Sequence, residues 1–120
     1  MAGGEQVVKQ AVDLLLRAAP AGSRVILFGS YARGDARPDS DLDFMVVEPR
    51  VEDRYAEAIR LREALRPARV IADILVVSEK IFHDWADTPN TVIYEAAKEG
   101  KVYEQVARII AASDEEEEAR

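Results

Sequence analysis

The pattern of hydrophobic and polar positions predicts helices that alternate with strands. Helical stretches repeat an apolar residue every three or four positions, as Val8, Val12 and Leu15 do, and strands are short apolar runs bounded by turn residues. The last expected strand is apolar enough to be a central one. The expected helices cover residues 5–19, 30–33, 52–66, 79–85 and 91–99. The expected strands cover residues 24–28, 41–47 and 69–77.

The later helices carry signals for their ends and for their buried faces. In the helix over 52–66, Tyr55, Ile59 and the 61–65 stretch are expected to face the core. Ser78 is a good N-cap for the short helix that follows it. Gly100 is expected to end the last of these helices in the C′ role, which is usually left-handed.

Length and composition indicate one globular domain. The chain has 120 residues, of which 48% are hydrophobic and 32% charged. We divide it into a domain over residues 1–104 and a C-terminal extension over 105–120. In the extension, apolar positions between Val106 and Ile110 predict a further helical piece, and an acidic run over 114–118 follows.

Charge and compartment signals exclude several classes of function. The net charge of −7, without a basic patch, argues against direct nucleic-acid binding and favours a protein or small-molecule partner. There is no cysteine, and hence no disulfide framework or thiolate zinc site. The sequence has no basic-then-apolar signal pattern and no apolar run of the roughly 18 residues that span a membrane. We therefore expect a cytoplasmic protein.

The segment from Ile26 to Val46 carries the chemistry. Its first apolar strand ends at Gly29-Ser30, a polar turn follows, and Asp41 and Asp43 open the next strand. Residues two apart on a strand share a face, so these carboxylates lie about 7 Å apart along the backbone. This spacing leaves room for a divalent metal and phosphate, and it indicates nucleotide chemistry.

Asp73 is the third acidic candidate, because it interrupts an otherwise apolar strand. A lone buried carboxylate is costly unless it is paired or bound, so Asp73 is either satisfied by arginine or backbone donors, or it is a ligand. Three carboxylates from two strands would repel one another, and Mg²⁺ or Mn²⁺ would relieve that repulsion. Two ions roughly 3.5–4 Å apart can hold the attacking and leaving oxygens of a phosphoryl-type transfer. Asp41, Asp43 and Asp73 are thus the candidate catalytic and metal-binding residues.

Gly29, Ser30 and Arg33 are the candidate nucleotide-binding residues. Glycine permits close approach of the backbone, and free N–H groups at a helix start attract phosphate. The Ser30 hydroxyl could reach the terminal phosphates, although a glycine-serine pair by itself is a common turn. Arg33 could neutralise phosphate or brace the carboxylates, and both roles stay open. His83 has no part in this scheme and is interpreted as a surface or packing residue.

Taken together, these residues resemble a known family. The stretch GSYARGDARPDSDLDF is similar to the signature of the minimal nucleotidyltransferases of the DNA polymerase β-like superfamily, with ten residues between Gly29-Ser30 and the Asp41-Leu42-Asp43 motif. Asp73 matches the third aspartate of the family, and NTVIYEAAKEGKVYE is similar to its closing helix and Glu-Gly turn. The resemblance implies an α/β (α+β) domain with a small mixed sheet flanked by helices, as in the polymerase β palm.

The same resemblance implies an activity and a partner. Members transfer a nucleoside monophosphate from a nucleoside triphosphate to a hydroxyl with Mg²⁺, and minimal members often pair with a HEPN-domain toxin. The resemblance thus implies an antitoxin that uses ATP for AMPylation of a toxin tyrosine. Two alternatives stay open: a non-catalytic antitoxin that acts by binding, and a small-molecule nucleotidyltransferase whose homodimer interface supplies the acceptor site. The nucleotide base, the acceptor and the oligomeric state are not decided by the sequence.

Overall fold

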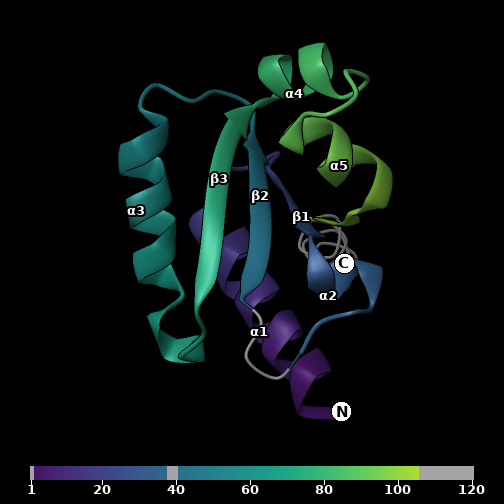
Figure 1. Ribbon diagram of the computed structural model, residues 1–120. Helices are drawn as coiled ribbons and strands as arrows, with labels where there is room; N and C mark the ends of the chain where they lie inside the picture. The colour runs from purple at the N-terminus through teal and green to yellow at the C-terminus, as the bar shows by residue number, and fades with distance from the viewer. Residues whose placement is uncertain (1, 38–40, 106–120) are drawn as a thin grey trace, which may run out of the picture.

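A four-stranded sheet with helices on both faces forms the framework of the protein (Figure 1). The computed structural model describes residues 2–37 and 41–105. No helix within these ranges has both the length and the apolar character needed to cross a membrane. The elements in chain order are α1 (Ala2–Ala18), β1 (Arg24–Phe28), α2 (Ser30–Arg33), β2 (Leu42–Glu48), α3 (Arg54–Ala64), the 3-10 turn η1 (Arg66–Ala68), β3 (Ala72–Ser78), α4 (Glu79–Trp85), α5 (Val92–Glu99) and β4 (Lys101–Glu104).

The sheet is mixed, with the strand order β3-β2-β1-β4. Strand β1 pairs antiparallel with β2 and β4, and β2 pairs parallel with β3. The expected fold class, a small mixed sheet flanked by helices, is confirmed. The expectation of a central position for β3 is wrong, because β3 lies at an edge. Its apolar sequence has another cause: helices cover both faces of the sheet, so Val76 and Val77 are buried on opposite sides.

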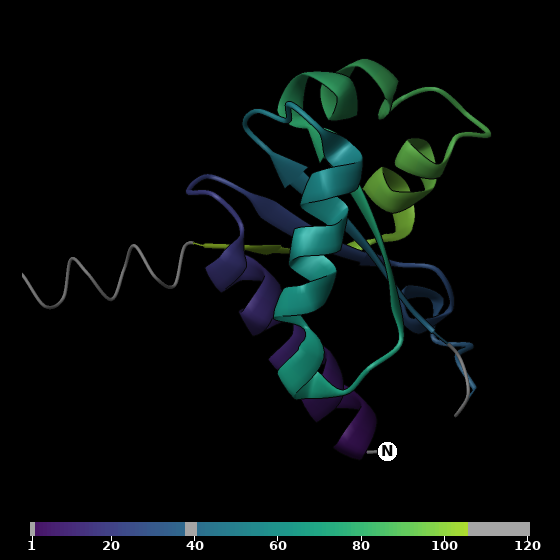
Figure 2. The same ribbon diagram turned by 90° about the vertical axis from the view of Figure 1, so that its left-hand side faces the viewer.

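Two apolar layers, one on each face of the sheet, make up the core. Helices α1 and α3 cover one face, and α4 and α5 lie over the other (Figure 2). Successive residues of β2 enter alternate layers, as the period of a strand requires. The first layer includes Val12, Leu15, Leu42, Phe44, Val46, Leu61 and Ile74. The second includes Ile26, Met45, Val47, Val77, Ile93 and Ala96.

Helix α3 turns a different face to the core than its sequence suggests. The side chains of Tyr55 and Ile59 are 70% and 58% exposed, so their expected place in the core is wrong, whereas Leu61 and Leu65 are buried as expected. At 100° per residue, Leu61 and Leu65 share a face with Ala58, and Tyr55 and Ile59 lie about a quarter turn away. The helix therefore carries large apolar side chains on its solvent side.

The ends of α4 and α5 show one expectation confirmed and one corrected. Ser78 caps α4, because its hydroxyl accepts a hydrogen bond from the Ile81 N–H at 3.1 Å. Helix α5 ends before Gly100 as expected, but Gly100 is not in the left-handed conformation usual for a C′ glycine, since its φ is −77°. A glycine is needed there for space: a Cβ would collide with the Ala96 carbonyl and with the Ile26 side chain. Strand β4, which the sequence did not reveal, follows directly.

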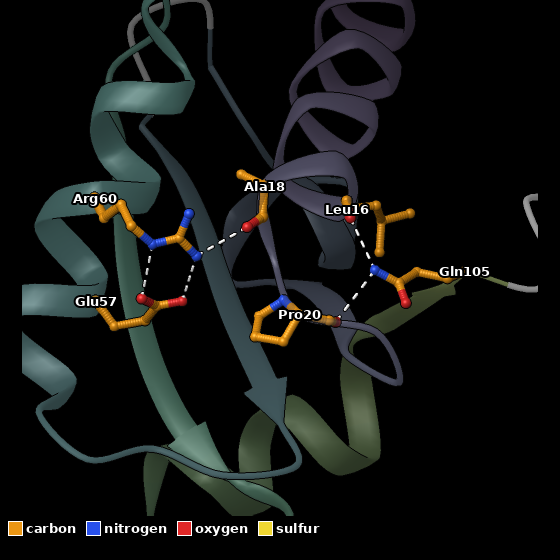
Figure 3. Close-up of polar contacts among 6 residues, drawn as sticks. All are labelled: Leu16, Ala18, Pro20, Glu57, Arg60 and Gln105. Atoms are coloured by element: carbon orange, nitrogen blue, oxygen red, sulfur yellow. Dashed lines mark hydrogen bonds and ion pairs between the residues drawn. The ribbon is translucent and has the colours of Figure 1, made fainter.

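Gln105 fastens the end of β4 to the turn between α1 and β1 (Figure 3). Its buried side chain accepts a hydrogen bond from the Gly22 N–H at 2.9 Å and donates to the carbonyls of Leu16 and Pro20 at 2.8 and 3.3 Å. Gln105 is the first residue of the expected C-terminal extension, and the rest of that extension, 106–120, lies outside the described residues. A truncation that tests the extension should therefore keep Gln105.

Arg60 makes a second tie, between α3 and the end of α1 (Figure 3). Its guanidinium donates to the Ala18 carbonyl at 2.8 Å and forms an ion pair with Glu57 at 2.7 Å. Glu48, at the end of β2, interacts with this pair and is only 2% exposed. Burial, followed by a hydrogen bond and charge repulsion from Glu57, raises the pKa of Glu48 to about 8.

We expect the buried Glu48 to make the protein less stable at alkaline pH. The folded protein keeps a proton on Glu48 where the unfolded chain, with its pKa of 4.5, has lost it. The free energy of unfolding should therefore fall as pH rises from about 4.5 to about 8. Between pH 5.5 and 8.5 we expect the Tm to fall by roughly 5–10 °C, and Glu48→Gln should remove most of this slope. Equal slopes in both proteins would refute the assignment.

Candidate active site

The candidate active site lies where β1 ends and where β2 and β3 begin. Because β2 and β3 run parallel, with Asp43 directly opposite Asp73, these two carboxylates leave the sheet side by side. On the other side of β2, Asp43 is opposite Phe28, the last residue before Gly29. Asp41 precedes β2 by one residue. The register therefore brings residues separated by 30 positions of sequence to one point of the sheet.

Neighbouring carboxylates repel one another at the candidate active site, and this repulsion affects the pKa of Asp43. The pKa of Asp43 is raised, first by burial and then by the negative charges of Asp73, Asp41 and Glu95. The positive charge of Arg33 acts in the opposite direction. Asp43 therefore lies close enough to the other acidic residues and to Arg33 for their charges to affect its pKa.

Gly29 brings the backbone directly against the Asp43 carboxylate. It begins α2 with a φ of 76°, which side-chain-bearing residues rarely adopt, and a Cβ at this position would collide with Oδ2 of Asp43. Ser30 is the first residue of α2, and Gly34 ends the helix in the left-handed conformation. The close approach of the backbone to Asp43 and the positive φ therefore both favour glycine at position 29.

Arg33 and Glu95 form the rim of the site. The guanidinium of Arg33 lies 3.4 Å from a carboxylate oxygen of Glu95 and 3.5 Å from one of Asp35. The Arg33 side chain is half-exposed, so it could either brace the carboxylates or bind phosphate, the two roles expected for it. Sequence reasoning missed Glu95, because a glutamate on an amphipathic helix looks like an ordinary surface residue. His83 lies exposed on α4, as expected for a surface residue.

The acidic residues suit Mg²⁺ or Mn²⁺ in their chemistry. Carboxylate oxygens are the donors that these ions prefer, and a divalent cation would relieve the repulsion that raises the pKa of Asp43. Within residues 2–37 and 41–105, no three Asp, Glu or His side chains converge closely enough to hold one ion. The acidic residues therefore suit Mg²⁺ or Mn²⁺ because they are carboxylates that lie near one another, and not because the described side chains form a closed set of three ligands.

A groove adjoins the site on the side of Asp73. It runs from the end of α3 past η1 to the start of β3, and its lining includes Asp73 but neither Asp41 nor Asp43. The lining residues are Arg62, Glu63, Leu65, Arg66, Arg69, Val70, Ile71, Ala72 and Asp73.

Neighbouring carboxylates that could hold a pair of divalent ions suit the chemistry of phosphatases, polymerases and nucleases, in which two ions stabilise the attacking and leaving oxygens. Residues 8–103 match the nucleotidyltransferase domain family, and the chain belongs to this family. The match spans most of α1 through to β4 and includes every candidate site residue. No curated protein matches the chain. Family membership makes the protein a transferase of nucleotidyl groups, with a nucleoside triphosphate as its substrate.

Proposed function

We propose that the protein transfers AMP from ATP to a tyrosine hydroxyl of a HEPN-domain toxin and so acts in the cytoplasm as its antitoxin. The observation that carries the proposal is the side-by-side placement of Asp43 and Asp73, with Gly29 against Asp43. Asp73 is also exposed and lies at the edge of an open groove, which favours a large acceptor over an enclosed small molecule.

In the proposed reaction, each candidate residue has a separate task. Asp41, Asp43 and Asp73 would hold Mg²⁺ or Mn²⁺, two ions in all, which when bound neutralise the phosphates and favour ionisation of the acceptor hydroxyl. Asp73 accepts the proton of the hydroxyl as its oxygen bonds to the α-phosphorus and pyrophosphate leaves. Gly29 admits the phosphates to the backbone, and Ser30 and Arg33 donate hydrogen bonds to them.

Labelled ATP tests the proposed transfer directly. The protein and Mg²⁺ are incubated with ATP labelled at the α-phosphate and with the product of the adjacent gene, which the proposal takes to be the HEPN-domain toxin. We expect label on the HEPN protein, and replacement of the acceptor tyrosine by phenylalanine should remove it. Neutralisation of the toxin without label would overturn the proposal in favour of an antitoxin that acts by binding.

We expect ATP with Mg²⁺ to raise the Tm, because a ligand that binds only the folded state stabilises it. At a hundredfold excess over Kd the gain is about 2.7 kcal/mol, or several degrees for a domain of this size. Ser30→Ala should reduce this rise. Ser78→Ala, which removes the cap of α4, is the matched control: it should lower the Tm but leave the ATP-induced rise intact. A wild-type protein that shows no rise in millimolar ATP-Mg²⁺ would contradict the nucleotide site.

A further inference from the structure

Helix α3 presents a continuous apolar and basic stripe to solvent. Tyr55, Ile59, Arg62 and Arg66 are spaced by four, three and four residues, so they lie along one side of the helix and its extension into η1. All four are exposed. Figure 2 shows α3 as the element nearest the viewer on this side of the protein. We call these four residues the α3 stripe.

The stripe leads into the groove that ends at Asp73. Arg62 and Arg66 belong to both, and the groove adds Arg69 and the side chain of Ile71, which is 75% exposed. Ile71, Tyr55 and Ile59 are the most exposed large apolar side chains among the described residues, and exposed apolar side chains grouped on one surface are typical of interaction sites. Asp73 is in register with Asp43 and shares the face of the sheet that α4 and α5 cover, whereas α3 covers the other face. Because β3 is an edge strand and the groove reaches Asp73, a chain lying along α3 would reach the proposed proton acceptor around this edge of the sheet.

The charge of this surface is opposite to that of the protein as a whole. The chain carries a net charge of −7, yet three arginines line the groove against two acidic residues, Glu63 and Asp73, so the lining has a formal charge of +1. Arg66 is paired with Glu63 at 3.2 Å, whereas Arg62 and Arg69 form no ion pair with any of residues 2–37 or 41–105. Unpaired guanidinium groups beside exposed isoleucines suit a ligand that is acidic and partly apolar.

We propose that the α3 stripe and the groove dock an acidic, partly apolar segment of the acceptor protein and bring its hydroxyl to Asp73. This inference rests on the proposed function. A nucleic acid fits this surface less well, because no described residue that lines the groove is aromatic, and Tyr55 is the one aromatic side chain among the residues of the stripe and the groove on which a base could stack. A short acidic segment needs opposite charges and apolar contacts only along the α3 stripe.

Labelled peptides test the docking surface. The probe is a fluorescein-labelled peptide of about 16 residues, composed of glutamate, leucine and one tyrosine, long enough to lie along α3. A peptide with glutamine in place of glutamate and a uridine RNA of equal length are the comparisons. By fluorescence anisotropy, we expect the acidic peptide to bind at least about tenfold more tightly than either and to weaken as salt is added.

Variants locate the binding on α3. Arg62→Glu with Arg66→Glu should weaken binding of the acidic peptide at least about tenfold, and Ile59→Gln by about threefold or more. The matched control is Lys9→Glu with Arg17→Glu, which makes the same change of charge on exposed positions of α1 and should have little effect. All of these variants should keep the ATP-induced rise in Tm.

Several results would overturn the inference. These are equal binding of the acidic and glutamine peptides, equal effects of the α3 and α1 charge reversals, and tighter, arginine-dependent binding of the RNA. A wild-type dimer in sedimentation that the α3 reversal dissociates would assign the surface to a second copy of the chain. Absence of the ATP-induced rise in the wild type would refute the nucleotide site instead, so the two proposals fail separately.

Discussion

Replacing Asp43 by asparagine should lower AMP transfer by at least about 100-fold while the fold is kept, since metal-assisted charge stabilisation supplies several kcal/mol. Asparagine preserves the shape of the side chain and removes its charge. Because burial and neighbouring acids raise the pKa of Asp43, its ionised form is disfavoured in the folded protein. The Tm of the variant at neutral pH should therefore equal or exceed that of the wild type.

Asp13→Asn provides the comparison for this variant. Asp13 lies on α1, is exposed and pairs with Arg17, so its loss should change neither transfer nor Tm appreciably. Transfer is followed with ATP labelled at the α-phosphate, and the Tm by calorimetry. Substantial transfer by Asp43→Asn would remove Asp43 from the catalytic set, and a large fall in its Tm would show that the carboxylate has a structural role.

A single methyl group on Gly29 should also abolish transfer. In Gly29→Ala the Cβ has to displace the Asp43 carboxylate, and a misplacement of about 1 Å in a catalytic group can cost about 100-fold in rate. The positive φ adds about 1–3 kcal/mol of backbone strain. We therefore expect a lower Tm, loss of the ATP-induced rise and loss of transfer together.

Gly34→Ala separates the two causes. Gly34 lies at the other end of α2 and has a similar φ of 84°, but a Cβ there would meet no atom within 4 Å. This variant should carry a comparable fall in Tm while keeping transfer within a few fold of the wild type. If both alanine variants lost transfer equally, backbone strain in α2, and not contact with Asp43, would be the reason that position 29 needs glycine.

Local signals predicted much of the fold. The limits of β1 and α4 follow from apolar runs and from the Ser78 cap, and both depend only on near neighbours in sequence. The orientation of α3 could not be predicted, because Ile59 and Leu61 are equally apolar and only the packing against β3 decides which is buried. The edge position of β3 and the existence of β4 depend on pairing between distant segments, which periodicity does not record.

The candidate site, like the fold, has a part that local sequence signals predict and a part that depends on the packing of distant segments. Asp41 and Asp43 are linked by their spacing, and a strand fixes which face they share. That Asp73 lies beside Asp43 depends on the register of two strands, and from the sequence it followed only from an unexplained carboxylate and a family resemblance. Glu95 and the groove come from helices placed by packing, so no pattern in the chain indicated that they border the site.

The path of the chain between β2 and β3 separates the candidate catalytic residues from the proposed docking surface on α3. Asp43 and Asp73 stand near the starts of two parallel strands, while the chain leaves β2 at its opposite end and returns through α3. The loop over 49–53 is therefore remote from the carboxylates and could accept insertions without shifting their register. Exchange of this one crossover between related proteins would replace the outward face of α3 as a module, so partner choice could diversify by recombination while the strands that carry the aspartates stay the same.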